Sequence, residues 1–256
     1  MGSIINPYII SSSGGGGGGG AYSNIYSFHD SLAGNNKQIP NNSLNPPLVQ
    51  ADFTNGTAGS FTFSCWMNND SLSRYRDDWV SAASYYDKVQ IEVRSSYVRY
   101  VQRAATGGWQ SNYIWITQNT GTWYHYCFSI NTATNTFAGY VNGANKGVNI
   151  NSDIGISIWN GATNGGWGVA NYIGYIDEVA IYDGALSDSD VADLYNGGTV
   201  PDLSTLSTYS DCVDWWKFDN DTYNGSYPDT ITGEKGHDIV IGTNAANASL
   251  LSTNKP

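Results

Sequence analysis

The sequence predicts an all-β protein, a two-sheet antiparallel sandwich with one short helix after the last core strand. Short runs of β-branched and aromatic residues recur along the chain, separated by clusters of Asn, Gly, Ser, Thr and Asp, and this pattern is typical of strands joined by turns. Only the segment after Ser187 carries a convincing helix start. The 256 residues, 40% hydrophobic and 14% aromatic, can bury one sizeable core.

Residues 60–67 predict the first core strand, because apolar side chains occupy alternate positions. Residues 123–130 predict a second strand, and residues 137–143 follow it as a hairpin partner. Residues 175–182 predict a third, rich in isoleucine, valine and tyrosine. The side chains expected to be buried or half-buried in these strands are Phe61, Phe63, Cys65, Phe128, Ile176, Val179 and Ile181.

Asp183-Gly184 is expected to end the third strand, and a short helix follows. Ser187 can cap it, and the acidic residues of its first turn suit the helix dipole. Val191 with Leu194 or Tyr195 forms one apolar face, and Gly197 is the expected stop.

These three segments, taken with the continuation Ala185-Leu186-Ser187 and Leu194-Tyr195, resemble the laminin-G-like, concanavalin A-like lectin/glucanase jelly-roll family. The resemblance covers roughly residues 50–200 and implies a concanavalin A-like jelly roll. It leaves the activity open, since one fold hosts many functions.

Residues 211–219, with Trp215 and Trp216, resemble the opening segment that this family normally carries at its amino terminus. Such a late segment is similar to that of structural proteins of marine tailed bacteriophages. Residues 205–256 are therefore expected to supply a closing strand to one domain spanning residues 21–256. A truncated second domain is the alternative, although so short a segment cannot close a sandwich alone.

Residues 1–20 predict an arm on a tether. A compact apolar peptide precedes the seven glycines of residues 14–20, and a glycine run behaves as a flexible linker. The arm suits docking into another subunit, and the alternative is a tail without a role. The docking residues expected are Ile4, Ile5, Tyr8, Ile9 and Ile10.

The formal net charge of −11 argues against nucleic acid and against an anionic membrane surface as partners. The charge is uneven: residues 150–256 carry three basic and fifteen acidic side chains, whereas residues 74–103 carry six basic and four acidic ones. This asymmetry either orients a neighbouring copy or partner, as expected of a homo-oligomer, or reflects a solvated acidic face.

No enzymatic activity and no cofactor are expected. The glucanases of this fold need paired carboxylates on one strand face, whereas Asp177 and Glu178 are adjacent and would point to opposite faces of a regular strand. The histidines have no zinc spacing, and the three widely spaced cysteines are expected to be free, with Cys65 and Cys127 buried in strands. Calcium remains an alternative to a surface turn at Asp77 and Asp78 and to a helix cap at Asp188 and Asp190.

Aromatic and amide side chains in loops favour carbohydrate binding, because sugar rings stack on aromatic faces and hydrogen-bond to amides. Trp66 and Trp123 are instead expected in the core. The candidate carbohydrate-binding residues are Trp109, Trp159, Asn160, Asn164 and Trp167.

Two functions follow. The first is a phage virion structural protein, a capsid decoration or cement protein or a tail-surface module, assembled with other virion subunits in the host cytoplasm and displayed on the virion surface. The second is a lectin-like adhesin that binds host glycan. The start of the chain shows no basic region and no long apolar run, so it lacks a signal peptide; a recombinant domain with a replaced signal is the alternative to release by lysis.

Overall fold

The structure is a computed structural model that describes residues 27–30, 43–45, 52–53, 60–70, 76–81, 88–103, 109–150, 168–170, 174–219, 230–240, 251–252 and 255–256. The arm of residues 1–20, and with it Ile4, Ile5, Tyr8, Ile9 and Ile10, lies outside the described residues. In the described part, no helix is long and apolar enough to span a membrane.

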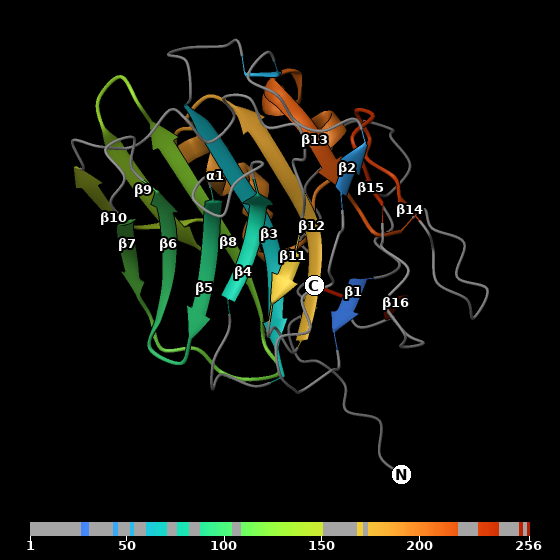
Figure 1. The fold of residues 1–256 in the computed structure, drawn as a ribbon, viewed down its shortest axis with the longest axis horizontal. Helices are drawn as coiled ribbons and strands as arrows, with labels where there is room; N and C mark the ends of the chain where they lie inside the picture. The colour runs from blue at the N-terminus through green and yellow to red at the C-terminus, as the bar shows by residue number, and fades with distance from the viewer. Residues whose placement is uncertain are drawn as a thin grey trace.

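Two antiparallel sheets form the predicted sandwich (Figure 1). The larger, here the back sheet, has the order β10-β9-β8-β3-β12-β1-β16, with β13 also paired to β12. Its strands are β1 (Ser27–Asp30), β3 (Phe61–Asn69), β8 (Trp123–Asn131), β9 (Thr136–Val141), β10 (Ala144–Ile150), β12 (Gly174–Asp183), β13 (Cys212–Trp216) and β16 (Leu251–Ser252).

The second, here the front sheet, has the order β11-β4-β5-β6-β7 and crosses before the back sheet in Figure 1. Its strands are β4 (Arg76–Ser81), β5 (Lys88–Arg94), β6 (Tyr97–Arg103), β7 (Trp109–Trp115) and β11 (Gly168–Ala170). A small third sheet, β14-β15-β2, was not predicted; it joins β2 (Ser43–Asn45), β14 (Thr230–Ile231) and β15 (Asp238–Val240).

The main core lies between the two large sheets. Every residue expected in it from the sequence is buried. From the front sheet, Tyr100 packs its ring 5.8 Å from that of Phe128 and 5.1 Å from that of Phe137. Gly139 lets β7 approach closely, because a Cβ there would collide with the side chain of Ile114. The sheets therefore pack without room for insertion between β7 and β9.

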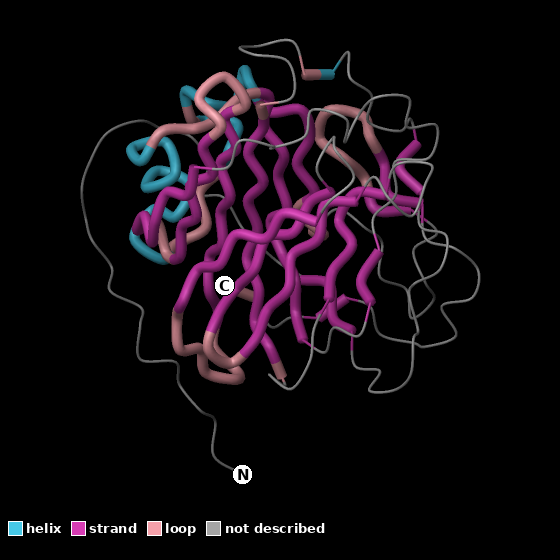
Figure 2. The backbone as a smooth tube through the Cα atoms, turned by 60° about the vertical axis from the view of Figure 1, so that its left-hand side comes forward, coloured by secondary structure: helices cyan, strands magenta, loops and turns pink. Residues whose placement is uncertain are grey.

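A second apolar cluster covers the other face of the back sheet. Helix α1 (Asp188–Tyr195) buries Val191 and Leu194 there, together with 3-10 turns η3 (Asn196–Gly198), η4 (Leu203–Thr205) and η5 (Ser207–Asp211). Figure 2 shows these helical segments gathered at one side of the strands. The predicted cap is present, because the Ser187 hydroxyl accepts from the backbone N–H of Asp190. The predicted stop was late: Tyr195 is the last helical residue, and Asn196 takes the left-handed conformation with φ 45°.

The late segment is tied to the back sheet by β13. Trp215 and Trp216 are both buried, and β13 pairs with β12 along Val179–Tyr182. The carboxylate of Asp214 accepts backbone N–H bonds from Trp215, Lys235 and His237 at 2.6, 2.9 and 2.6 Å. This buried carboxylate therefore fastens the turn before β15 to β13.

Candidate functional site

The front sheet turns one face toward the core and one face outward. On β6, Val98 and Tyr100 are buried, whereas Tyr97 and Arg99 are only half-buried. On β7, Asn112 and Ile114 are buried in the same alternation. The remaining face of β7 exposes Tyr113 at 39% and Trp115 at 71% of their surface, and such exposure of large aromatic side chains on a strand calls for a functional explanation.

Three rings form a cluster on this outer face, here called the aromatic platform: Tyr97, Tyr113 and Trp115. The rings of Tyr113 and Trp115 stack with centroids 5.7 Å apart and planes 13° apart. Tyr97 stands edge-on to both, at 5.2 Å from Tyr113 and 5.5 Å from Trp115. Two nearly parallel rings two positions apart on one strand, with a third ring at right angles, make a flat surface bounded by a ridge.

Arg99 places a polar group beside the platform. Its Nη1 donates to the hydroxyl of Tyr113 at 3.3 Å, and its guanidinium carbon lies 5.6 Å from the centre of the same ring. Strand pairing sets Glu92 of β5 opposite Arg99. The platform thus combines apolar ring faces with hydroxyl and guanidinium donors, which is the mixture that sugar-binding surfaces use.

Buried Gln118 supports the platform from below. Its amide donates to the backbone oxygens of Arg94 at 2.7 Å and Tyr97 at 3.3 Å. Its side-chain oxygen accepts from the hydroxyl of Tyr126 and from the amide of Asn69. These bonds hold the turn between β5 and β6, where Tyr97 begins, against both sheets, so the ring of Tyr97 is presented on a fixed backbone.

The residues predicted from sequence to bind carbohydrate are only partly placed. Trp109 is the first residue of β7 and pairs with Arg103, but its side chain lies outside the described residues. Trp159, Asn160, Asn164 and Trp167 also lie outside the described residues. The sequence analysis missed Tyr97, Arg99, Tyr113 and Trp115. The alternation in Tyr-Val-Arg-Tyr and in Ser-Asn-Tyr-Ile-Trp could have indicated a shared strand face.

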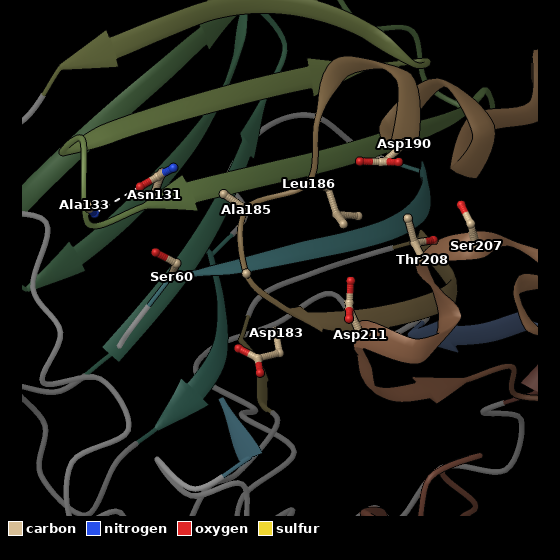
Figure 3. A pocket seen from close by; sticks show the side chains of 11 residues that line it. Ser60, Asn131, Ala133, Asp183, Ala185, Leu186, Asp190, Ser207, Thr208 and Asp211 are labelled. Atoms are coloured by element: carbon tan, nitrogen blue, oxygen red, sulfur yellow. Dashed lines mark hydrogen bonds between the residues drawn. The ribbon is translucent and has the colours of Figure 1, made fainter. Parts of the chain in front are cut away.

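A polar pocket of about 460 Å³ lies elsewhere, between the start of β3, the β8–β9 turn, the link from β12 to α1, and η5 (Figure 3). Asp183, Asp190 and Asp211 line it together with hydroxyl side chains. The carboxylate of Asp190 already accepts from the backbone and hydroxyl of Ser187. Among the described residues no group of three His, Cys, Asp or Glu side chains could hold a metal ion, and this pocket offers no aromatic face for a sugar ring.

The carboxylates adjacent in sequence on β12 are both buried, at 0% exposure for Asp177 and 4% for Glu178. The expected alternation does not apply to them, because the register shifts between Asp177 and Ala180 and Glu178 has φ 51°. Glu178 accepts a bond of 2.6 Å from the indole of Trp215. This geometry fixes the indole in the second apolar cluster and does not place the carboxylates on a surface.

His125 is buried as well and faces the hydroxyl of Ser64, with Nε2 and Oγ 2.8 Å apart. Its ring lies 5.3 Å from Trp66 and 6.1 Å from Tyr195. Burial lowers the pKa of His125 from 6.5 to about 3. All three cysteines are buried and free, as expected, and burial raises the pKa of the Cys212 thiol to about 12, so it is not a thiolate nucleophile at neutral pH.

Comparison with known proteins agrees with this architecture. The chain belongs to the concanavalin A-like lectin/glucanases superfamily, whose family model matches residues 42–192. Comparison with curated proteins gave no match.

Three solved structures illustrate the similarity. A Bacteroides ovatus protein thought to bind carbohydrate aligns with a TM-score of 0.51 and 16% identity, over 84% of this chain and 57% of its own. Domain 4 of an extracellular arabinanase from Geobacillus stearothermophilus, solved with arabinotriose, has 22% identity and a TM-score of 0.42 over 55% of this chain and 68% of that domain. A heptameric pentraxin from Limulus polyphemus covers 88% of this chain and 98% of its own, with 12% identity and a TM-score of 0.45. This chain thus spans little more than half of the Bacteroides protein, and the similarity concerns the fold.

Proposed function

We propose that this protein is a carbohydrate-binding module and that the aromatic platform on the front sheet holds the sugar. The observation that carries the proposal is Trp115, which is 71% exposed and stacked on Tyr113. An aromatic side chain of this size is normally buried, and here two parallel rings are held open instead. Membership of the lectin/glucanase superfamily supports the same class of function.

In the proposed complex, the C–H groups of a sugar ring lie against the faces of Tyr113 and Trp115. The edge-on ring of Tyr97 limits sliding across the strands, because it stands at 70° to Trp115. The Tyr113 hydroxyl and the Arg99 guanidinium, 3.3 Å apart, bond to sugar hydroxyls at the rim. A sheet face of this kind suits an extended saccharide chain more than a single buried sugar, since it is open along the strands.

The test is saccharide binding by the full chain, measured by calorimetry and by tryptophan fluorescence on a panel of oligosaccharides. Trp115→Ala is expected to weaken binding at least tenfold, and Trp115→Phe to retain part of it. Trp123→Phe is the matched control, because Trp123 pairs with Tyr175 on the back sheet with ring centroids 6.1 Å apart. Equal binding by wild type and Trp115→Ala would overturn the proposal, as would the absence of saccharide binding by the wild type.

The expectation of a virion structural protein remains a prediction about the setting in which this module works. It depends on the arm of residues 1–20, which lies outside the described residues. A glycan-binding sandwich displayed on a virion surface is compatible with the platform, because the platform and the arm belong to different parts of the chain.

A further inference from the structure

The free edges of the two large sheets are not equally protected against pairing with another strand. Natural edge strands avoid such pairing by being short, by carrying charge, or by a bulge. In the described residues, β11 has three residues and β16 has two. β10 is longer, but exposed Lys146 and a register shift between Asn145 and Gly147 interrupt its pairing.

β7 has none of these protections. It has seven residues, contains neither proline nor a charged side chain, and pairs with β6 in unbroken register from Tyr97–Trp115 to Arg103–Trp109. None of the described strands pairs with its other side. Residues 104–145 contain no Asp, Glu, Lys or Arg, in a chain of net charge −11. This edge is therefore a place where two copies meet without like-charge repulsion.

The hydrogen bonds of β7 are arranged for a further strand. The N–H of Ile116 bonds to the carbonyl of Ser96 at 3.1 Å, so residues 116, 114 and 112 direct their backbone groups toward β6. Antiparallel pairing alternates along a strand. The backbone groups of Ser111, Tyr113 and Trp115 consequently point away from β6, toward the open edge.

We propose that a second copy of this chain pairs with this edge, β7 against β7, around a two-fold axis at Asn112. In that register Ser111 lies opposite Tyr113 of the partner subunit, and Trp109 opposite Trp115 of the partner subunit. These opposed residues are the ones whose backbone groups point outward, so the register and the hydrogen-bond alternation agree. Like tryptophans at both ends of β7 make the strand self-complementary, as a two-fold interface requires.

Pairing in this way joins two five-stranded sheets into one continuous ten-stranded sheet. Both aromatic platforms then lie on the same face. This arrangement does not depend on the identity of the ligand, but it gives the proposed sugar-binding function two adjacent sites and hence avidity for a repeating glycan.

The test is the mass of the full chain in solution by sedimentation and by light scattering, over a wide range of concentrations. The wild type is expected at twice the chain mass of 27.7 kDa at high micromolar concentration, and to dissociate on dilution. Ser111→Pro removes an outward N–H without breaking the bonds to β6, and is expected to be monomeric. Ser111→Lys is a second route to the same result, useful if the proline variant does not fold.

Ala133→Lys is the matched control, because it adds the same charge at an exposed turn between β8 and β9 and is expected to remain dimeric. Far-UV circular dichroism and melting confirm that each variant is folded. A wild type that is monomeric at all concentrations would overturn the proposal. A folded Ser111→Pro or Ser111→Lys variant that dimerises like the wild type would overturn it too.

Discussion

The buried imidazole of His125 makes stability depend on pH in a calculable way. The side chain is 1% exposed, lies between the rings of Trp66 and Tyr195, and has its Nε2 2.8 Å from the hydroxyl of Ser64. Among the described residues its Nδ1 has no hydrogen-bond partner, so no group balances a positive charge on the ring. Burial accordingly lowers the pKa of His125 from 6.5 to about 3.

The sign follows from proton linkage. Between pH 6.5 and about 3 the unfolded chain binds a proton at His125 and the folded chain does not, so stability falls as pH falls through this window. Each pH unit below 6.5 costs up to about 1.4 kcal/mol. From pH 6.5 to 5 the loss is about 2 kcal/mol, which corresponds to roughly 4–8 °C in melting temperature for a domain of this size.

The assay is urea unfolding of wild type and His125→Phe, followed by tryptophan fluorescence between about pH 5 and 8. Other titrating groups contribute equally to both proteins, so the difference between their unfolding free energies isolates His125. The substitution costs stability at every pH, but the wild type should lose about 2 kcal/mol more on acidification to pH 5.

Ser64→Ala is the control, because it removes the hydroxyl beside Nε2 and leaves the imidazole buried. It should displace the whole curve and preserve its slope. A wild-type curve that runs parallel to that of His125→Phe would refute the burial of a neutral imidazole at this position.

Two further predictions concern the chain ends. Asp214→Ala leaves three backbone N–H groups without their acceptor and should destabilise the fold by about 2–4 kcal/mol; faster proteolysis within residues 230–240 would report the released turn, and an unchanged digestion pattern would contradict it. Deletion of residues 1–20 should leave the melting temperature within about 1 °C of wild type, whereas incorporation into a particle should be lost if Ile4–Ile10 dock on another subunit; normal incorporation would refute the docking role.

The core was predictable because its signals are local. Alternation in residues 60–67 indicated which side of β3 is buried, and the capping serine indicated where α1 begins. The boundary errors have local causes as well. Asn196 adopts a left-handed conformation that glycine was expected to supply, and the bulge at Glu178 with φ 51° breaks an alternation that the sequence alone shows as regular.

The platform was not predictable in the same way. Tyr113 and Trp115 have the residue types of a core strand, and alternation alone does not tell which of the two faces meets the other sheet. That choice depends on long-range packing, because Gly139 of β9 admits Ile114 of β7 closely and so turns Tyr113 and Trp115 outward. An aromatic residue in a strand was therefore assigned to the core by composition, and loop tryptophans received the binding role instead.

The uneven charge connects the platform with the free edge of the front sheet. The acidic excess lies in residues 150–256, with fifteen acidic and three basic side chains, and this part of the chain includes α1, β13 and the turns behind the back sheet. The front-sheet segment of residues 74–103 has a small basic excess, and residues 104–145 carry no charged side chain of these types. An approaching copy is thus repelled from the back and admitted at β7, which orients association before any hydrogen bond forms. The same field leaves the platform accessible to glycans that carry negative charge, which the acidic side of the molecule would exclude.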